Sequence, residues 1–186
     1  MTKNLEREIE EAVLNHPEIL GFPQAKAIRN VRVGWAFGRV DIMLLPASSE
    51  TKLVLIEAKQ ARAADASSKV IGQLLMYYAG ALDIGSVGLE RLHEYAASHR
   101  EKALSPTWIS PKELTGGVSP PAAAWEVIQS GEKLRPEDVE LFIALNDAPH
   151  EALRIAIESL HEHHGLKIAL IVVQDGKPKL LSDHAW

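Results

Sequence analysis

The chain has 186 residues, a formal charge of −5 at pH 7, and 46% apolar and 24% charged residues. This composition is typical of one globular domain with one core, so we expect a single domain over 1–186. The absence of cysteine excludes disulfides, thiolate zinc sites and cysteine-ligated iron–sulfur clusters, and the acidic charge counts mildly against a protein that coats nucleic acid.

The first part of the chain predicts a helix followed by three strands. Apolar residues at helical spacing favour a helix over about 4–15, with Asn4 as its N-cap. Three segments rich in β-branched and aromatic residues then predict strands over 27–37, 39–45 and 53–59. Because these strands are close in sequence, we expect an antiparallel meander.

The rest of the chain predicts mainly helices and a C-terminal hairpin. An apolar stripe from Val70 to Leu82 favours a helix, and a segment rich in Pro, Gly, Ser and Thr over 105–121 favours a loop. Further helices are predicted over 89–103, 122–130, 136–145 and 149–164. A strand over 167–174 leads through the turn signal Asp175-Gly176 into a short strand.

This order of elements predicts an α/β fold in which helices cover a mixed central sheet. Its core would comprise about 4–82 and 166–182, and a helical insert would occupy about 88–164.

Three charged residues lie where a core pattern favours apolar ones. Asp41 stands between Val40 and Ile42, and Glu57 and Lys59 end the most hydrophobic strand of the N-terminal half. Residues i and i+2 of a strand face the same side, so Glu57 and Lys59 should project together, roughly 7 Å apart. Asp41, on the neighbouring strand, would reach them across about 5 Å.

Each of these residue types suits one part of a metal-dependent hydrolysis. The carboxylates of Asp41 and Glu57 are hard ligands for Mg²⁺ or Mn²⁺, and the backbone carbonyl of Ala58 would help to hold the ion. The ion would polarise a phosphate oxygen and activate a water molecule. Lys59 would position that water or stabilise charge on phosphorus.

The run from Gly38-Arg39-Val40-Asp41 to Ile56-Glu57-Ala58-Lys59 resembles the motif of the PD-(D/E)xK nuclease superfamily, with Val40 in place of the nominal proline. The segment Gly72-Gln73-Leu74-Leu75-Met76-Tyr77 looks like the GQLxxY helix of an endonuclease branch of that superfamily. The resemblance covers about residues 4–82. It implies a restriction-endonuclease-like α/β/α core and a Mg²⁺-dependent nuclease acting on nucleic acid, with DNA the favoured substrate.

The resemblance also implies two further site residues. The first helix of the family often supplies a carboxylate, which matches Glu6, three residues before Ile9, with Glu10 as the second choice. Gln73 lies off the main apolar stripe of its helix, and it would contact a ligand water or a phosphate. For both residues an ordinary solvated surface role stays open.

The sequence also leaves several alternative functions open. Asp41, Glu57 and Lys59 would also suit a structural ion cluster, or a catalytically inactive member that serves as a binding module in a nucleic-acid-processing complex. A small-molecule phosphohydrolase is weaker, because the sequence has no Gly-rich phosphate loop. His161 and His164 share a helix face and could bind a transition metal, but the position of His161, His163 and His164 near a helix C-terminus favours a simple interaction with the helix dipole.

The remaining expectations concern partners and location. The 88–164 segment would suit a homodimer contact or a partner protein. No apolar run approaches the 18 residues of a membrane span, and the N-terminus lacks a secretory pattern, so we expect a cytoplasmic protein. Tryptophans can stack on bases, although packing is the default role of Trp35, Trp108, Trp125 and Trp186.

Overall fold

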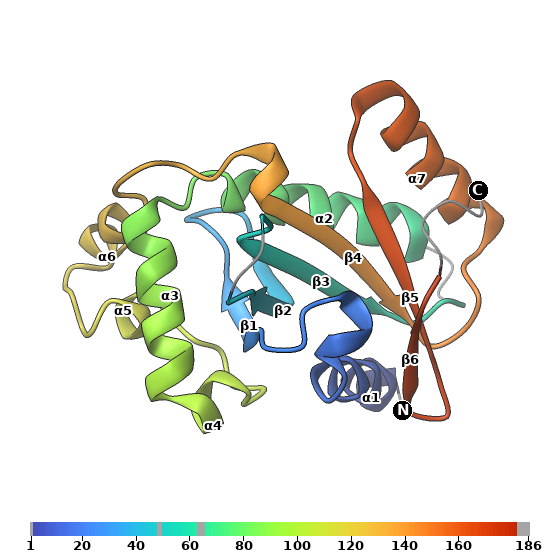
Figure 1. Cartoon of the computed structure of the whole chain (residues 1–186), viewed down its shortest axis with the longest axis horizontal. Helices are drawn as coiled ribbons and strands as arrows, with labels where there is room; N and C mark the ends of the chain where they lie inside the picture. Colours follow the sequence, from blue (N-terminus) through green and yellow to red (C-terminus); the bar gives the residue numbers. More distant parts are fainter. Residues whose placement is uncertain (1, 48–49, 63–65, 182–186) are drawn as a thin grey trace.

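The computed structural model of the protein describes residues 2–47, 50–62 and 66–181. A six-stranded sheet crosses its centre in the order β1-β2-β3-β4-β5-β6 (Figure 1). The strands are β1 (Lys26–Arg32), β2 (Arg39–Leu45), β3 (Leu53–Lys59), β4 (Val139–Leu145), β5 (Ile168–Gln174) and β6 (Lys177–Leu180). The spatial order thus follows the chain order.

Strand directions confirm the predicted meander and the mixed sheet. β1, β2 and β3 pair antiparallel, β4 and β5 continue the sheet in parallel, and β6 pairs antiparallel with β5. The predicted hairpin turn has positive φ at both Asp175 (51°) and Gly176 (70°), as a type I′ turn requires.

Helices cover both faces of this sheet. They are α1 (Thr2–Leu14), η1 (Pro17–Leu20), α2 (Ala66–Ala81), α3 (Ser86–Ser98), α4 (Arg100–Ala103), α5 (Pro111–Leu114), α6 (Pro121–Ile128), η2 (Pro136–Asp138) and α7 (Glu151–His164). On one face α1 buries Ile9 and Val13 against Ile56 and Phe142. On the other, α2 and α7 pack against the face that carries Leu55. The layers are therefore α/β/α.

The prediction of a helix over 136–145 is wrong. Only Pro136–Asp138 is helical, as a single 3₁₀ turn, and the chain then enters β4, a central strand. The apolar run of β4 is buried on both faces, so it lacks the alternation that separates a strand from a helix. The predicted insert over 88–164 consequently contains a strand of the central sheet as well as α7.

The purely helical part between α2 and β4 is α3 to α6. These helices lie beside the β1 edge of the sheet (Figure 1), and α3 and α4 contact β1 directly. The segment after α4 also joins this edge, since Ile109 forms a parallel bridge with Val31. This arrangement brings residues 105–110 to the same end of the sheet as the β1–β2 loop.

Three smaller expectations are also corrected. Asn4 lies inside α1 rather than capping it, and the loop predicted over 105–121 contains the short helix α5. β1 ends at Arg32 because the chain turns at Gly34, where φ is 77°. No helix in the described part of the chain is both long and apolar enough to cross a membrane.

Candidate active site

Asp41 is fixed at the end of the sheet where β2 begins and β3 ends. The β2–β3 register runs from Leu44–Val54 to Ile42–Ile56. One residue further along, Oδ2 of Asp41 accepts a hydrogen bond of 2.8 Å from the backbone N–H of Ala58. The side chain of Asp41 thus bridges to β3, and this contact holds its carboxylate beside Glu57.

Glu57 and Lys59 project together, as their spacing in β3 predicts. Nζ of Lys59 lies 3.8 Å from Oε1 of Glu57. The side chain of Glu57 is only 3% exposed, whereas that of Lys59 is 16% exposed. The carboxylate of Glu57 is therefore buried, whereas the ammonium group of Lys59 is partly accessible to solvent.

α1 brings one further carboxylate to this end of the sheet. Oε1 of Glu6 lies 3.5 Å from Nζ of Lys59. Glu10, the second choice from sequence, is instead 2.5 Å from Nε of Arg29, a side chain that is only 4% exposed. The geometry thus favours Glu6 over Glu10 as the α1 residue that faces Lys59.

Burial opposes the ionisation of both central carboxyl groups, and the charge of Asp41 further opposes that of Glu57. Burial, and then the negative charge of Asp41, raises the pKa of Glu57. Burial likewise raises the pKa of Asp41, although the hydrogen bond from Ala58 works in the opposite direction. Two buried like charges are costly, so the pair needs either a proton or a cation to offset the repulsion.

The donor set fits a hard divalent ion. Oε2 of Glu57 is buried and has no hydrogen-bond partner among the described residues, which leaves it available as a ligand. No group of three or more His, Cys, Asp or Glu side chains in the described ranges is arranged around a common metal position. Two carboxylates, a backbone oxygen and water suit Mg²⁺, which keeps several waters in proteins.

α2 adds a tyrosine that the sequence pattern alone does not assign to the site. Tyr77 is 4% exposed, and Nε2 of Gln73 donates to its hydroxyl oxygen at 3.4 Å. Burial, followed by the charges of Glu57 and Asp41, raises the pKa of Tyr77. Gln73 thus contacts a tyrosine that lies within the electrostatic reach of both carboxylates. The last position of the GQLxxY pattern is the signal that could have revealed Tyr77.

Gly38 allows Tyr77 to approach this end of the sheet. It has a φ of +88°, and an added Cβ would lie 2.9 Å from Cε1 of Tyr77. We expect Gly38→Ala to destabilise the protein by about 1–2 kcal/mol or more, measured by urea denaturation, and to displace Tyr77. Gly117→Ala is a matched control, because Gly117 has a φ of +91° and no atom within 4 Å of the added Cβ. Equal losses in the two variants would contradict a role for the Tyr77 contact.

Three other cationic side chains close to these residues in sequence lie in different surroundings. Lys52 is at the opposite end of β3, where Nζ is 3.2 Å from Oδ1 of Asp138. Arg62 pairs with Asp147 at 2.8 Å. Arg39, by contrast, stands two residues before Asp41, with its guanidinium 6.0 Å from the ring centre of Trp108.

The structure also shows where the three histidines and three of the four tryptophans lie. The three histidines occupy the last turn of α7, which Gly165 ends with a φ of 66°. Trp125 is buried in the core at 5% exposure, whereas Trp35 and Trp108 are 57% and 41% exposed. Trp186 lies outside the described residues. The two exposed tryptophans are therefore free to meet a ligand.

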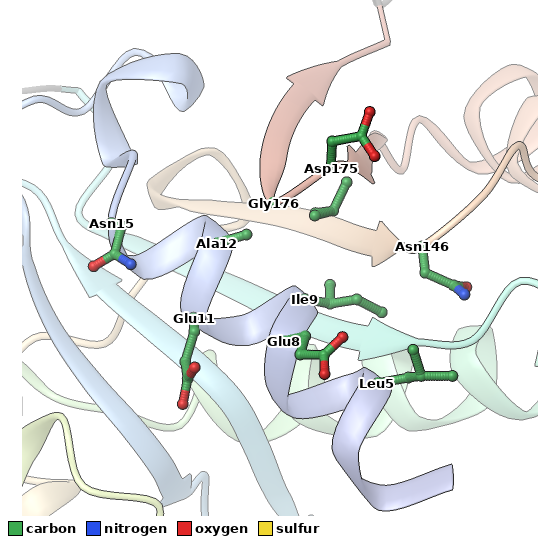
Figure 2. A pocket seen from close by; sticks show the side chains of 10 residues that line it. Leu5, Glu8, Ile9, Glu11, Ala12, Asn15, Asn146, Asp175 and Gly176 are labelled. Carbon is green, nitrogen blue, oxygen red and sulfur yellow. The ribbon is translucent and has the colours of Figure 1, made fainter. Parts of the chain in front are cut away.

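Two cavities lie away from these residues, and carboxylates line both. The first, the α1 groove, has a volume of about 490 Å³ and lies between α1, the end of β4 and the β5–β6 turn (Figure 2). The second, the α7 groove, has about 860 Å³ and lies between α7 and the starts of β4 and β5. The acids are Glu8, Glu11 and Asp175 in the first and Glu50, Glu137, Glu140, Glu158 and Glu162 in the second.

Comparisons with models of protein families, with curated proteins and with solved structures gave no match. The geometry of Asp41, Glu57 and Lys59 is therefore the main indication of what the chain does.

Proposed function

We propose that this chain is a nuclease that hydrolyses phosphodiester bonds in DNA with the help of Mg²⁺ or Mn²⁺. The observation that carries the proposal is the meeting of two buried carboxylates with an ammonium group at one sheet end. Burial raises the pKa of both carboxyl groups, the charge of Asp41 raises the pKa of Glu57 further, and Nζ of Lys59 is 3.8 Å from Glu57. A purely structural ion cluster would not need two acids in conflict, since buried charges are usually paired.

The chain's own residues would divide the work as follows. Asp41 and Glu57 would hold the ion, with the Ala58 carbonyl as a third oxygen, and Glu6 would hold the ammonium of Lys59. When bound, the ion supplies Lewis acidity, which polarises a phosphate oxygen and lowers the pKa of a water molecule. Lys59 would stabilise the negative charge that develops on the phosphate. On the α2 side, Gln73 would orient the hydroxyl group of Tyr77, a residue on whose pKa the charges of Glu57 and Asp41 act.

The order of elements around the site supports the same proposal. A helix, an antiparallel meander, a second helix and then parallel strands form an α/β/α core. The residues that resemble the PD-(D/E)xK motif lie on two neighbouring strands of this core, Asp41 on β2 and Glu57 and Lys59 on β3. The helix with the GQLxxY-like segment, α2, packs on one face of the sheet. We therefore interpret the core as restriction-endonuclease-like.

The proposal is tested by incubating the purified chain with single-stranded and duplex DNA and RNA, with Mg²⁺, Mn²⁺ or EDTA. We expect cleavage of DNA that depends on either metal ion and stops in EDTA. A folded protein that cuts none of these substrates would contradict the nuclease and favour the inactive binding module. In that case the 88–164 segment is the first region to probe for a homodimer or partner contact.

A further inference from the structure

Two arginines oppose each other directly at the end of the β1–β2 pair, beside the candidate site. Arg32 and Arg39 are partners in the antiparallel register. Directly opposed side chains lie about 5 Å apart at Cβ, where like charges are destabilising. Among the described residues, neither arginine forms an ion pair. Such a pair is a favourable place for an anion that bridges both guanidinium groups.

An exposed indole ring lies next to this pair. Trp108 is 41% exposed, and the guanidinium of Arg39 is 6.0 Å from its ring centre. The segment is anchored to β1, because Ile109 bridges Val31 and Nδ2 of Asn30 donates to the carbonyl oxygen of Pro106 at 2.7 Å. The ring is therefore held at the sheet edge with much of its surface open.

The surface formed by Arg32, Arg39 and Trp108 lies close to the carboxylates of the candidate site. Arg39 is two residues before Asp41 in β2, which corresponds to about 7 Å along a strand. The positive charge of Arg39 also reaches the site, since it acts on Tyr77 against the effect of Glu57. A phosphate between Arg32 and Arg39 would thus lie about one nucleotide from a phosphate held at Asp41 and Glu57.

The two grooves described above are electrostatically unfavourable for a polyanion. Both the α1 groove and the α7 groove are lined by several carboxylates, which repel phosphates. In contrast to these two grooves, the Arg32–Arg39–Trp108 edge combines positive charge with an open aromatic face. Its chemistry matches the grooves that bind single strands, in which arginines follow the backbone and aromatic rings stack on bases.

We propose that Arg32, Arg39 and Trp108 bind one unpaired nucleotide of the DNA strand beside the scissile bond, with its phosphate between the arginines and its base stacked on Trp108. An unpaired base is required because both faces of a base inside a duplex are already stacked on its neighbours. The enzyme would therefore act on single-stranded segments. This inference rests on the proposed nuclease site, but binding tests it separately from cleavage.

The experiment measures fluorescence anisotropy of a labelled oligodeoxynucleotide, single-stranded or annealed to its complement, in EDTA so that no cleavage occurs. We expect the single strand to bind more tightly, and Trp108→Leu to weaken single-strand binding roughly tenfold or more with little effect on the duplex. Arg39→Gln should also weaken binding, and Trp108→Phe should retain most of the affinity because it keeps a ring. Arg91→Gln, an exposed arginine on α3, is the control for charge.

The outcomes separate the two proposals. Unchanged single-strand affinity in Trp108→Leu, or an equal loss for single strand and duplex, would overturn the stacking inference even if the wild type cuts DNA. Single-strand binding that depends on Trp108, in a protein that cuts no substrate with Mg²⁺ or Mn²⁺, would support the inference and contradict the nuclease proposal.

Discussion

Replacing Glu57 with glutamine should lower the rate of DNA cleavage at least 100-fold while the protein stays folded. Glutamine keeps the shape of the side chain in a position that is 2% exposed, but it removes the charge that would hold the ion. Loss of one preorganised electrostatic group typically costs about 100- to 1000-fold in kcat. The measurement is initial cleavage rate under saturating Mg²⁺, with circular dichroism as the check on folding.

Glu126→Gln is the matched control, because it makes the same chemical change at an exposed position of α6. It should cleave at the wild-type rate. Cleavage by Glu57→Gln within threefold of wild type would show that the activity resides elsewhere in the chain. A fall in KM along with kcat would indicate lost ground-state strain rather than a lost metal ligand.

The residues that form the core of the site could be placed from local sequence pattern. β2 and β3 have the predicted bounds, 39–45 and 53–59, because each is a short apolar run ended by turn residues. The antiparallel meander follows from their closeness in sequence. These two facts are sufficient to bring Asp41 to Glu57, since the first residues of β2 must face the last residues of β3.

Contacts between segments that are far apart in the chain could not be predicted from the local sequence pattern. β4 pairs in parallel with β3 although more than 75 residues separate them, and its fully buried run carries no strand period. Arg29 is likewise buried on β1 in a pair with Glu10 of α1, a contact that no local pattern indicates. The apolar stripe from Val70 to Leu82 likewise gives no reason to place Tyr77 near the carboxylates, yet its ring is buried and the charges of Glu57 and Asp41 act on it.

Without divalent ions, the free energy of unfolding of the wild type should fall as pH rises above about 4.5, relative to that of Glu57→Gln. The pKa of Glu57 is raised in the folded protein, by burial and then by the charge of Asp41. In this range the folded state binds a proton that the unfolded state has released, so stability decreases with pH. The contribution is full below the unfolded pKa and is lost as pH rises through the folded pKa, with a slope of about 1.4 kcal/mol per pH unit.

Urea denaturation in EDTA at several pH values measures this difference, and Glu57→Gln should become the more stable protein towards neutral pH.

Adding Mg²⁺ should then stabilise the wild type but not the variant, because a ligand that binds only the folded state adds RT ln(1 + [L]/Kd). The same carboxylates would thus weaken the fold when alone and strengthen it with a cation, which a structural ion cluster would not do. Parallel pH curves for the two proteins, with no effect of Mg²⁺ on either, would contradict both the buried acid pair and its role as a metal site.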